Sequence, residues 1–289
     1  MDERLLLPAP AAAVGGAPPE VFSRRQLAGA LKLDRLGLGF LAAPLMRWLD
    51  IERLNRTYAR IAQAEGRQFL DTALEVLEID YRVSARDLAR VPRSGAFVAL
   101  PNHPYGGIDG LILLHLLSGL RADFRVMANV HLRSMPVLAP FLILVNQYRD
   151  LGTREVNVSG ILRCLRHLRG GGSLGVFAAG AVAVRERLGG PLRDQPWHPT
   201  IGRIVARSGA AVLPVFFEGS NGRLFDLLGL VHPPLRRYLL SVELFRRAGS
   251  TVPVRIGPVV GPERIAACRD NDELMQLLYA RTWELADPR

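Results

Sequence analysis

A histidine and an aspartate near the middle of the chain are the residues whose types and spacing best suit acid–base chemistry. They are His103 and Asp109, in the segment GAFVALPNHPYGGIDGLILLHLL that runs from residue 95 to 117. An imidazole can take a proton from a hydroxyl group at neutral pH, and a carboxylate behind it can fix its tautomer and stabilise the imidazolium. Such a pair requires no side-chain nucleophile. Spacing alone leaves a structural alternative open, in which Asp109 is an ordinary helix cap and His103 a turn residue.

The elements around this pair are expected to position both side chains. An apolar strand precedes the histidine and an apolar helix follows the aspartate. Pro101 and Pro104 favour extended backbone at the residues before them, so His103 should leave the carboxyl end of the strand in a fixed direction. Open α/β sheets bind ligands at that edge. Gly106 and Gly107 permit a sharp reversal and a close approach of a substrate to the backbone.

Strand and helix patterns alternate through the rest of the chain, which predicts an α/β sheet covered by helices. We expect strands at 95–101, 124–128, 142–146, 174–178, 211–217 and 252–256, and helices near 110–119, 156–169, 199–208 and 272–286. Ser84 and Asp87 have the spacing of a cap at the start of a short helix. The glycines at 170–172 are interpreted as a helix terminator, because no Walker motif follows them. Three arginines spaced by three residues are interpreted as a solvated helix face: Arg163, Arg166 and Arg169.

The amino-terminal third of the chain has a different character. We predict a flexible tail at 1–21, a helical segment at 22–83 that Pro44 kinks or breaks, and an α/β domain at 84–289. The first stretch of this helical segment, residues 23–50, mixes leucines, Phe40 and Trp48 with basic residues, a composition typical of a helix lying on an anionic bilayer. A helix packed on the core with its arginines extended to solvent is the alternative. The basic residues are Arg24, Arg25, Lys32, Arg35 and Arg47.

Charge and composition restrict the class of protein. The 289 residues are 49 % hydrophobic and 22 % charged, which predicts a folded chain with a sizeable core. The net charge of +10 favours phosphate-bearing partners, namely nucleic acid, anionic lipid or a phosphorylated substrate. Only 7 % of residues are aromatic and none forms an RNA-binding motif, so nucleic acid is the weakest of the three.

Cysteine usage and hydropathy bear on the compartment. Cys164 and Cys268 are far apart and lack the spacing of a zinc site or a disulfide framework, which favours the cytosol. Every apolar run ends before about 18 residues, so no transmembrane helix is predicted. The acidic start followed by Ala, Pro and Gly lacks the pattern of a signal peptide.

The segment NHPYGGIDG at 102–110 resembles the NHPxGGxDG motif of the bacterial hemolysin-like branch of the lysophospholipid (glycerolipid) acyltransferase superfamily. Further blocks resemble that branch in the same order and extend the resemblance over about residues 30–260. They are FRVMANVHLRSMPVLAPFLILVNQY, LGVFAAGAV, AVLPVFFEGSNGRLFDLLGLVHPPLRR and VPVRIGPVV.

The resemblance implies a mixed sheet covered by helices and an O-acyltransferase that needs no metal and no cofactor. His103 would deprotonate an acceptor hydroxyl, which then attacks the thioester of an acyl-CoA or acyl-carrier-protein donor, while Asp109 orients the imidazole. Backbone amides of Gly106 and Gly107 are candidates to stabilise the oxyanion. The acceptor would be lysolipid-like, such as a 1-acylglycerol 3-phosphate or an amino-acid-derived lipid. The enzyme would sit peripherally on anionic lipid at the inner face of the cell membrane.

The resemblance also implies substrate-binding residues. They are Asn102, Gly106, Gly107, Arg149, Gly180, Glu218, Asn221 and Arg223. One departure stands out, since Ala179 and Ala181 occupy the positions where the superfamily and this branch carry a glutamate. It motivates an alternative function, a non-catalytic descendant of the fold that binds a lipid or an acyl thioester.

Overall fold

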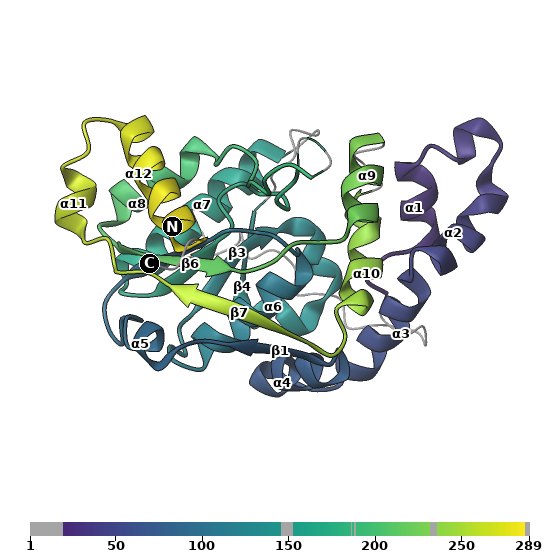
Figure 1. Ribbon diagram of the computed structural model, residues 1–289, viewed down its shortest axis with the longest axis horizontal. Coiled ribbons are helices and arrows are strands. Elements are labelled where there is room, and N and C mark those ends of the chain that lie inside the picture. The colour runs from purple at the N-terminus through teal and green to yellow at the C-terminus, as the bar shows by residue number, and fades with distance from the viewer. Residues whose placement is uncertain (1–19, 146–152, 186, 188, 232–235, 287–289) are drawn as a thin grey trace, which may run out of the picture.

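The computed structural model describes residues 20–145, 153–185, 187, 189–231 and 236–286 (Figure 1). Their strands form a single mixed sheet in the order β1-β7-β6-β2-β5-β3-β4, in which β7 runs antiparallel to β6 and the other neighbours run parallel. The strands are β1 (Ile79–Arg82), β2 (Phe97–Pro101), β3 (Arg125–Asn129), β4 (Leu142–Val145), β5 (Ser173–Val176), β6 (Ala211–Phe217) and β7 (Ser250–Ile256).

Helices cover both faces of the sheet, so every residue of the central strand β2 is buried. Successive side chains of a strand point to opposite faces, and β2 follows this rule. Phe97 and Ala99 join a core with α4 (Gly66–Val76) and α6 (Gly107–Ser118). Val98 and Leu100 join a second core with α7 (Thr153–Arg169), α8 (Pro199–Ser208) and α12 (Asn271–Trp283). The continuous apolar sequence of β2 is the consequence of this two-sided burial.

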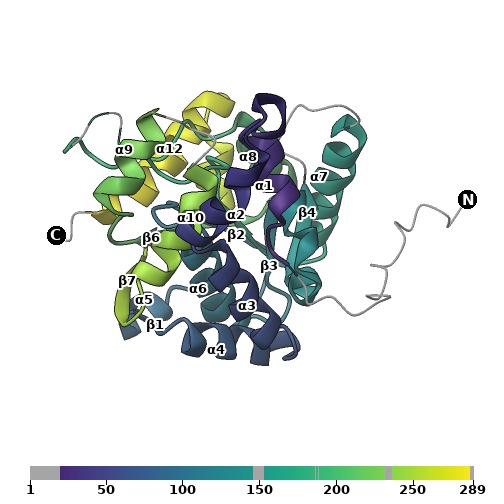
Figure 2. The same ribbon diagram turned by 90° about the vertical axis from the view of Figure 1, so that its right-hand side faces the viewer.

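A third core lies beyond the end of the sheet toward which β6 runs. There α9 (Arg223–Val231) and α10 (Arg236–Arg246) stand between the sheet and α1 (Arg24–Ala30), α2 (Ala42–Trp48) and α3 (Ile51–Ile61) (Figure 1). Figure 2 looks onto this end and shows α10 beside α2 and α3. Leu27, Met46 and Leu49 from the amino-terminal helices pack against Phe225 and Leu239. The helices α9 and α10 therefore join the amino-terminal helices to the sheet.

The six expected strands and four expected helices are all present, with ends shifted by a few residues. Ser84 caps α5 (Ala85–Leu88) by accepting a hydrogen bond from the amide of Asp87. The prediction for Pro44 was wrong: this residue lies in the first turn of α2, where its missing N–H breaks no helical hydrogen bond. Strand β1 and the helices α9, α10 and α11 (Pro262–Ala266) were not predicted from the sequence. No helix among the described residues is both long and apolar enough to cross a bilayer.

Candidate active site

His103 and Asp109 meet at the carboxyl edge of the sheet, between β2 and α6. The Nδ1 atom of His103 lies 2.9 Å from Oδ2 of Asp109. The same carboxylate oxygen accepts hydrogen bonds from the backbone amides of Tyr105 at 2.9 Å and Gly106 at 3.0 Å. Asp109 is fully buried in the first turn of α6. It therefore closes the turn and holds the imidazole at the same time, which combines both interpretations of the sequence.

This contact defines the tautomer of His103. An ionised carboxylate only accepts hydrogen bonds, so Nδ1 of His103 carries the proton and Nε2 is left with its lone pair. The His103 side chain is 16 % exposed. The ring of Phe177, which directly follows β5, covers one face of the imidazole with 4.0 Å between the ring centroids. The imidazole is thus held on two sides, and no described residue hydrogen-bonds to Nε2, the atom that a general base would use.

The glycine turn differs from the expectation in one respect. Gly106 adopts a φ of +92°, which favours glycine, and a β-carbon there would lie 3.0 Å from a methyl group of Leu240. Its amide donates to Asp109, so this N–H is already engaged within the turn. The amide of Gly107, an exposed residue, donates to no described group and begins α6. Gly107 is the remaining backbone candidate, at the positive end of the helix dipole.

Asn102 and Glu218 have partners within the fold. The buried amide of Asn102 donates to the carbonyl of Phe217 at 3.0 Å and accepts from its amide at 2.7 Å, so it ties the ends of β2 and β6 together. Glu218 follows β6 and forms an ion pair with Arg255. Its carbonyl accepts a hydrogen bond of 2.6 Å from the hydroxyl of Tyr105. These contacts support the turn that presents His103.

The loop after β5 lies against His103. The amide of Ala183 donates to the carbonyl of His103 at 2.8 Å, and Gly180, at φ +65°, closes a turn back to Phe177. Ala181 is exposed and Ala179 is partly buried in this turn. Ala179 and Ala181 therefore lie in the loop that borders the imidazole.

A second buried aspartate, which the sequence analysis missed, holds the backbone of His103. Oδ1 of Asp194 accepts from the amide of His103 at 3.1 Å, and Oδ2 accepts from the indole N–H of Trp197 at 3.0 Å. Burial raises the pKa of Asp194, and the two hydrogen bonds oppose that rise. An aspartate 91 residues from the histidine carries no local pattern that reveals this contact.

Replacing Asp194 by asparagine should lower kcat about tenfold, because one amide oxygen cannot accept from both His103 and Trp197. The additional change Trp197→Phe removes the second donor and should restore part of the lost kcat. Thioester cleavage by the two variants tests this, with the thermal midpoint as a check on folding. A double variant no faster than Asp194→Asn would show that the hydrogen bond to His103 is not what Asp194 contributes.

The remaining predicted substrate residues have different environments. Arg223 is exposed at the start of α9. Asn221 is only 6 % exposed, and neither polar atom of its side chain has a hydrogen-bond partner among the described residues. Arg149 lies outside the described residues.

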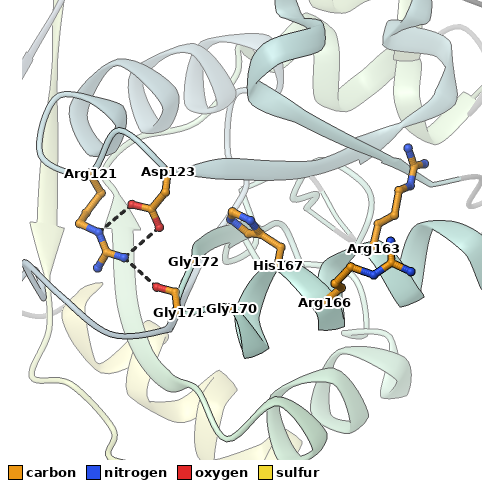
Figure 3. A pocket seen from close by; sticks show the side chains of 8 residues that line it. All are labelled: Arg121, Asp123, Arg163, Arg166, His167, Gly170, Gly171 and Gly172. Carbon is orange, nitrogen blue, oxygen red and sulfur yellow. Dashed lines mark hydrogen bonds and ion pairs between the residues drawn. The ribbon is translucent and has the colours of Figure 1, made fainter.

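Two other histidines have polar partners away from this edge. His115 lies between Tyr81, at 2.7 Å from its Nδ1, and Asp71, at 2.8 Å from its Nε2. His167 borders a hollow of about 590 Å³ at the amino end of β5 (Figure 3). There Arg121 binds Asp123 and the carbonyl of Gly171.

The glycines at this hollow end helix α7 as expected, since the amides of residues 170–172 donate to carbonyls of its last turn. Arg163, Arg166 and Arg169 are exposed, in agreement with a solvated face. Basic residues near a helix carboxyl terminus stabilise it through the helix dipole. These groups lie at the opposite end of β5 from the His103 edge and have a structural explanation.

Comparison with known proteins identifies the family of this chain. A protein family described as acyltransferase matches residues 25–281, which is most of the sequence. The chain belongs to this acyltransferase family.

Two relatives of this acyltransferase are lyso-glycine lipid O-acyltransferases. The protein from Phocaeicola vulgatus is 27 % identical over 161 residues, which are 55 % of this chain and 54 % of the relative, so the match spans about half of that protein. The protein from Bacteroides thetaiotaomicron is 26 % identical over 200 residues, which are 66 % of this chain and 70 % of the relative. A crystal structure of PlsC, the 1-acyl-sn-glycerophosphate acyltransferase of Thermotoga maritima, aligns with a TM-score of 0.48 and 16 % identity, over 92 % of this chain and 99 % of that one.

Proposed function

We propose that this acyltransferase moves a fatty acyl group from a thioester, acyl-CoA or acyl-carrier protein, to a hydroxyl group of a lysolipid-like acceptor. The observation that carries the proposal is the 2.9 Å contact between His103 and Asp109, which leaves Nε2 of His103 as a base. The names of the two relatives support an amino-acid lysolipid as the acceptor. A 1-acylglycerol 3-phosphate is the second acceptor to test.

The proposed reaction proceeds through one tetrahedral intermediate. Nε2 of His103 takes the proton of the acceptor hydroxyl as its oxygen attacks the thioester carbonyl. The negative charge passes to the carbonyl oxygen, which the amide of Gly107 can stabilise, while Asp109 stabilises the imidazolium. Collapse of the intermediate breaks the carbon–sulfur bond, and the imidazolium returns its proton to the leaving thiolate. An ester and a free thiol result, so no metal or cofactor enters the balance.

Ala179 and Ala181 favour a second candidate function, a protein that binds a lipid or an acyl thioester without transferring it. The loop that borders His103 has alanines at the two positions where the motif that it resembles carries a glutamate. This candidate predicts tight binding of the donor with no release of thiol.

Thiol release from long-chain acyl-CoA and acyl-carrier protein separates the two functions. Each donor is mixed with an amino-acid lysolipid, a 1-acylglycerol 3-phosphate or no acceptor, and products are identified by mass. Acceptor-dependent thiol release with an esterified product supports the transferase. Binding of donor and acceptor without any product would overturn it in favour of the non-catalytic descendant.

We further propose that the enzyme acts at an anionic membrane surface, the inner face of the cell membrane. Phe40 is 67 % exposed and Trp48 is 54 % exposed, next to and within α2. All five basic residues between positions 23 and 50 are exposed: Arg24, Arg25, Lys32, Arg35 and Arg47. Exposed aromatic and basic side chains together suit a bilayer interface, where each cation contributes about 1 kcal/mol.

The double substitution of Phe40 and Trp48 by serine should weaken binding to vesicles of anionic lipid at least tenfold, because both side chains lose the burial in the bilayer. Vesicle sedimentation measures the partition. Val158 and Leu162, which are 54 % and 53 % exposed on α7, provide the matched control when both are replaced by serine. Equal loss in the two double variants would contradict docking through α2, and so would unchanged binding of the first.

A further inference from the structure

The loop after β6 and the helix α10 enclose a group of buried polar atoms beside the catalytic turn. Seven buried side-chain nitrogen and oxygen atoms lack a hydrogen-bond partner among the described residues, and four of them belong to Asn221, Arg236 and Arg247. Native proteins pair nearly all buried polar groups, because an unpaired one costs about 1–3 kcal/mol. A concentration of such groups in one place indicates a missing partner.

These residues share one neighbourhood. Arg247 donates to the carbonyl of Ser220, directly before Asn221. The guanidinium of Arg236 lies 5.9 Å from the ring centroid of Phe225, in the first turn of α9. All three side chains therefore adjoin the segment from Ser220 to Phe225.

Helix α10 also contacts the turn that carries His103. Arg236 and Leu240 are four residues apart, which places them on one side of α10, and Arg247 directly follows the last residue of this helix. Leu240 is the side chain that a β-carbon at Gly106 would meet. The guanidinium of Arg247 lies 4.7 Å from the ring centroid of Tyr105. The polar group is therefore next to the turn between His103 and Asp109.

The charges around this group leave an excess of positive charge. Asp226 is paired with Arg185 at 3.3 Å, and Glu243 is paired with Arg246 at 2.6 Å. Asp226 also attracts Arg236, but neither Arg236 nor Arg247 forms an ion pair within 4 Å with a described acid. Partly buried cations of this kind are stable when an anion supplies the opposite charge.

We propose that Asn221, Arg236 and Arg247 form a subsite for an oxyanion on the acceptor, beside the hydroxyl that His103 deprotonates. This inference rests on the proposed acyl transfer and names the chemical class of the acceptor. The ligand would be a negatively charged oxygen group, either a carboxylate or a phosphate. It would accept hydrogen bonds from the Asn221 amide and from the Nε atoms of Arg236 and Arg247. Arg223, the exposed first residue of α9, lies outside the proposed subsite.

Asn221→Leu tests the subsite because leucine has a similar volume and no polar atoms. The Asn221 amide makes no hydrogen bond to a described residue. Its removal should therefore leave the thermal midpoint unchanged or raise it. The acceptors are a lysolipid with a free carboxylate, its methyl ester and a lysolipid with a phosphate monoester. We expect the variant to raise KM at least tenfold for the anionic acceptor that wild type prefers, with kcat and the methyl ester reaction changed less than threefold.

Arg236→Gln should give the same selective rise in KM, and Arg203→Gln, which removes an exposed arginine from α8, is its matched control. Calorimetric binding of the anionic acceptors without a donor separates this inference from the transfer reaction. Tighter binding of one anion than of its uncharged analogue, lost in Asn221→Leu, supports the subsite even if no thiol is released. Equal binding of charged and uncharged acceptors by wild type would overturn it, as would unchanged binding by the variant.

Discussion

Replacing His103 by alanine should reduce kcat for acyl transfer about 10²–10⁴-fold, the usual contribution of a general base. The methyl group cannot take the proton of the acceptor hydroxyl, and the remaining turn still binds both substrates. KM should therefore change little. Thiol release under saturating donor and acceptor measures this loss directly.

His115 supplies the matched control, because it also contacts an aspartate, Asp71, but lies at the far end of α6. His115→Ala removes an imidazole with similar partners and should leave kcat within threefold of wild type. Circular dichroism checks that both variants fold. Full transfer by His103→Ala would exclude His103 as the base, and equal loss in both variants would assign the effect to folding.

The contact between His103 and Asp109 could be predicted from the sequence because its geometry is local. His103 and Asp109 are six residues apart across one strand–turn–helix junction, and two prolines and two glycines restrict that junction. The hydrogen bond from the Gly106 amide to Asp109 could not be predicted in the same way. It depends on which of several nearby donors reaches the Asp109 carboxylate, and the fold directs Tyr105 and Gly106 to it.

Contacts between distant segments escaped the sequence analysis. In the loop after β5, Val184 pairs antiparallel with Arg193, so the chain folds back on itself. This reversal brings Asp194 to the backbone of His103. Strand β1 has four residues, and only one of them is buried. Its alternation of apolar and polar residues is therefore too short to be distinguished from the pattern of the preceding helix. Its pairing with β7 joins residues about 170 positions apart, as with Ile79 and Ser250. Tertiary packing determines such elements more than local propensity does.

Asp109→Asn should also reduce kcat at least about a hundredfold, because the neutral amide no longer stabilises the imidazolium that forms on His103. Only one orientation of the amide fits the turn. Its oxygen must replace Oδ2, since three N–H groups, from His103, Tyr105 and Gly106, point at that position. The variant therefore keeps the turn and removes the charge, and its KM should stay within threefold of wild type.

Asp109→Ala separates the second role of this carboxylate. Without any acceptor, the buried amides of Tyr105 and Gly106 lose their partner, which should lower the free energy of unfolding by about 2–6 kcal/mol. Urea denaturation of wild type and the two variants measures that difference. If Asp109 is both a cap and a charge partner, asparagine lowers kcat with a small change in stability, whereas alanine lowers both. Unimpaired transfer by Asp109→Asn together with instability of Asp109→Ala would reduce Asp109 to a helix cap, the structural alternative that its spacing alone allows.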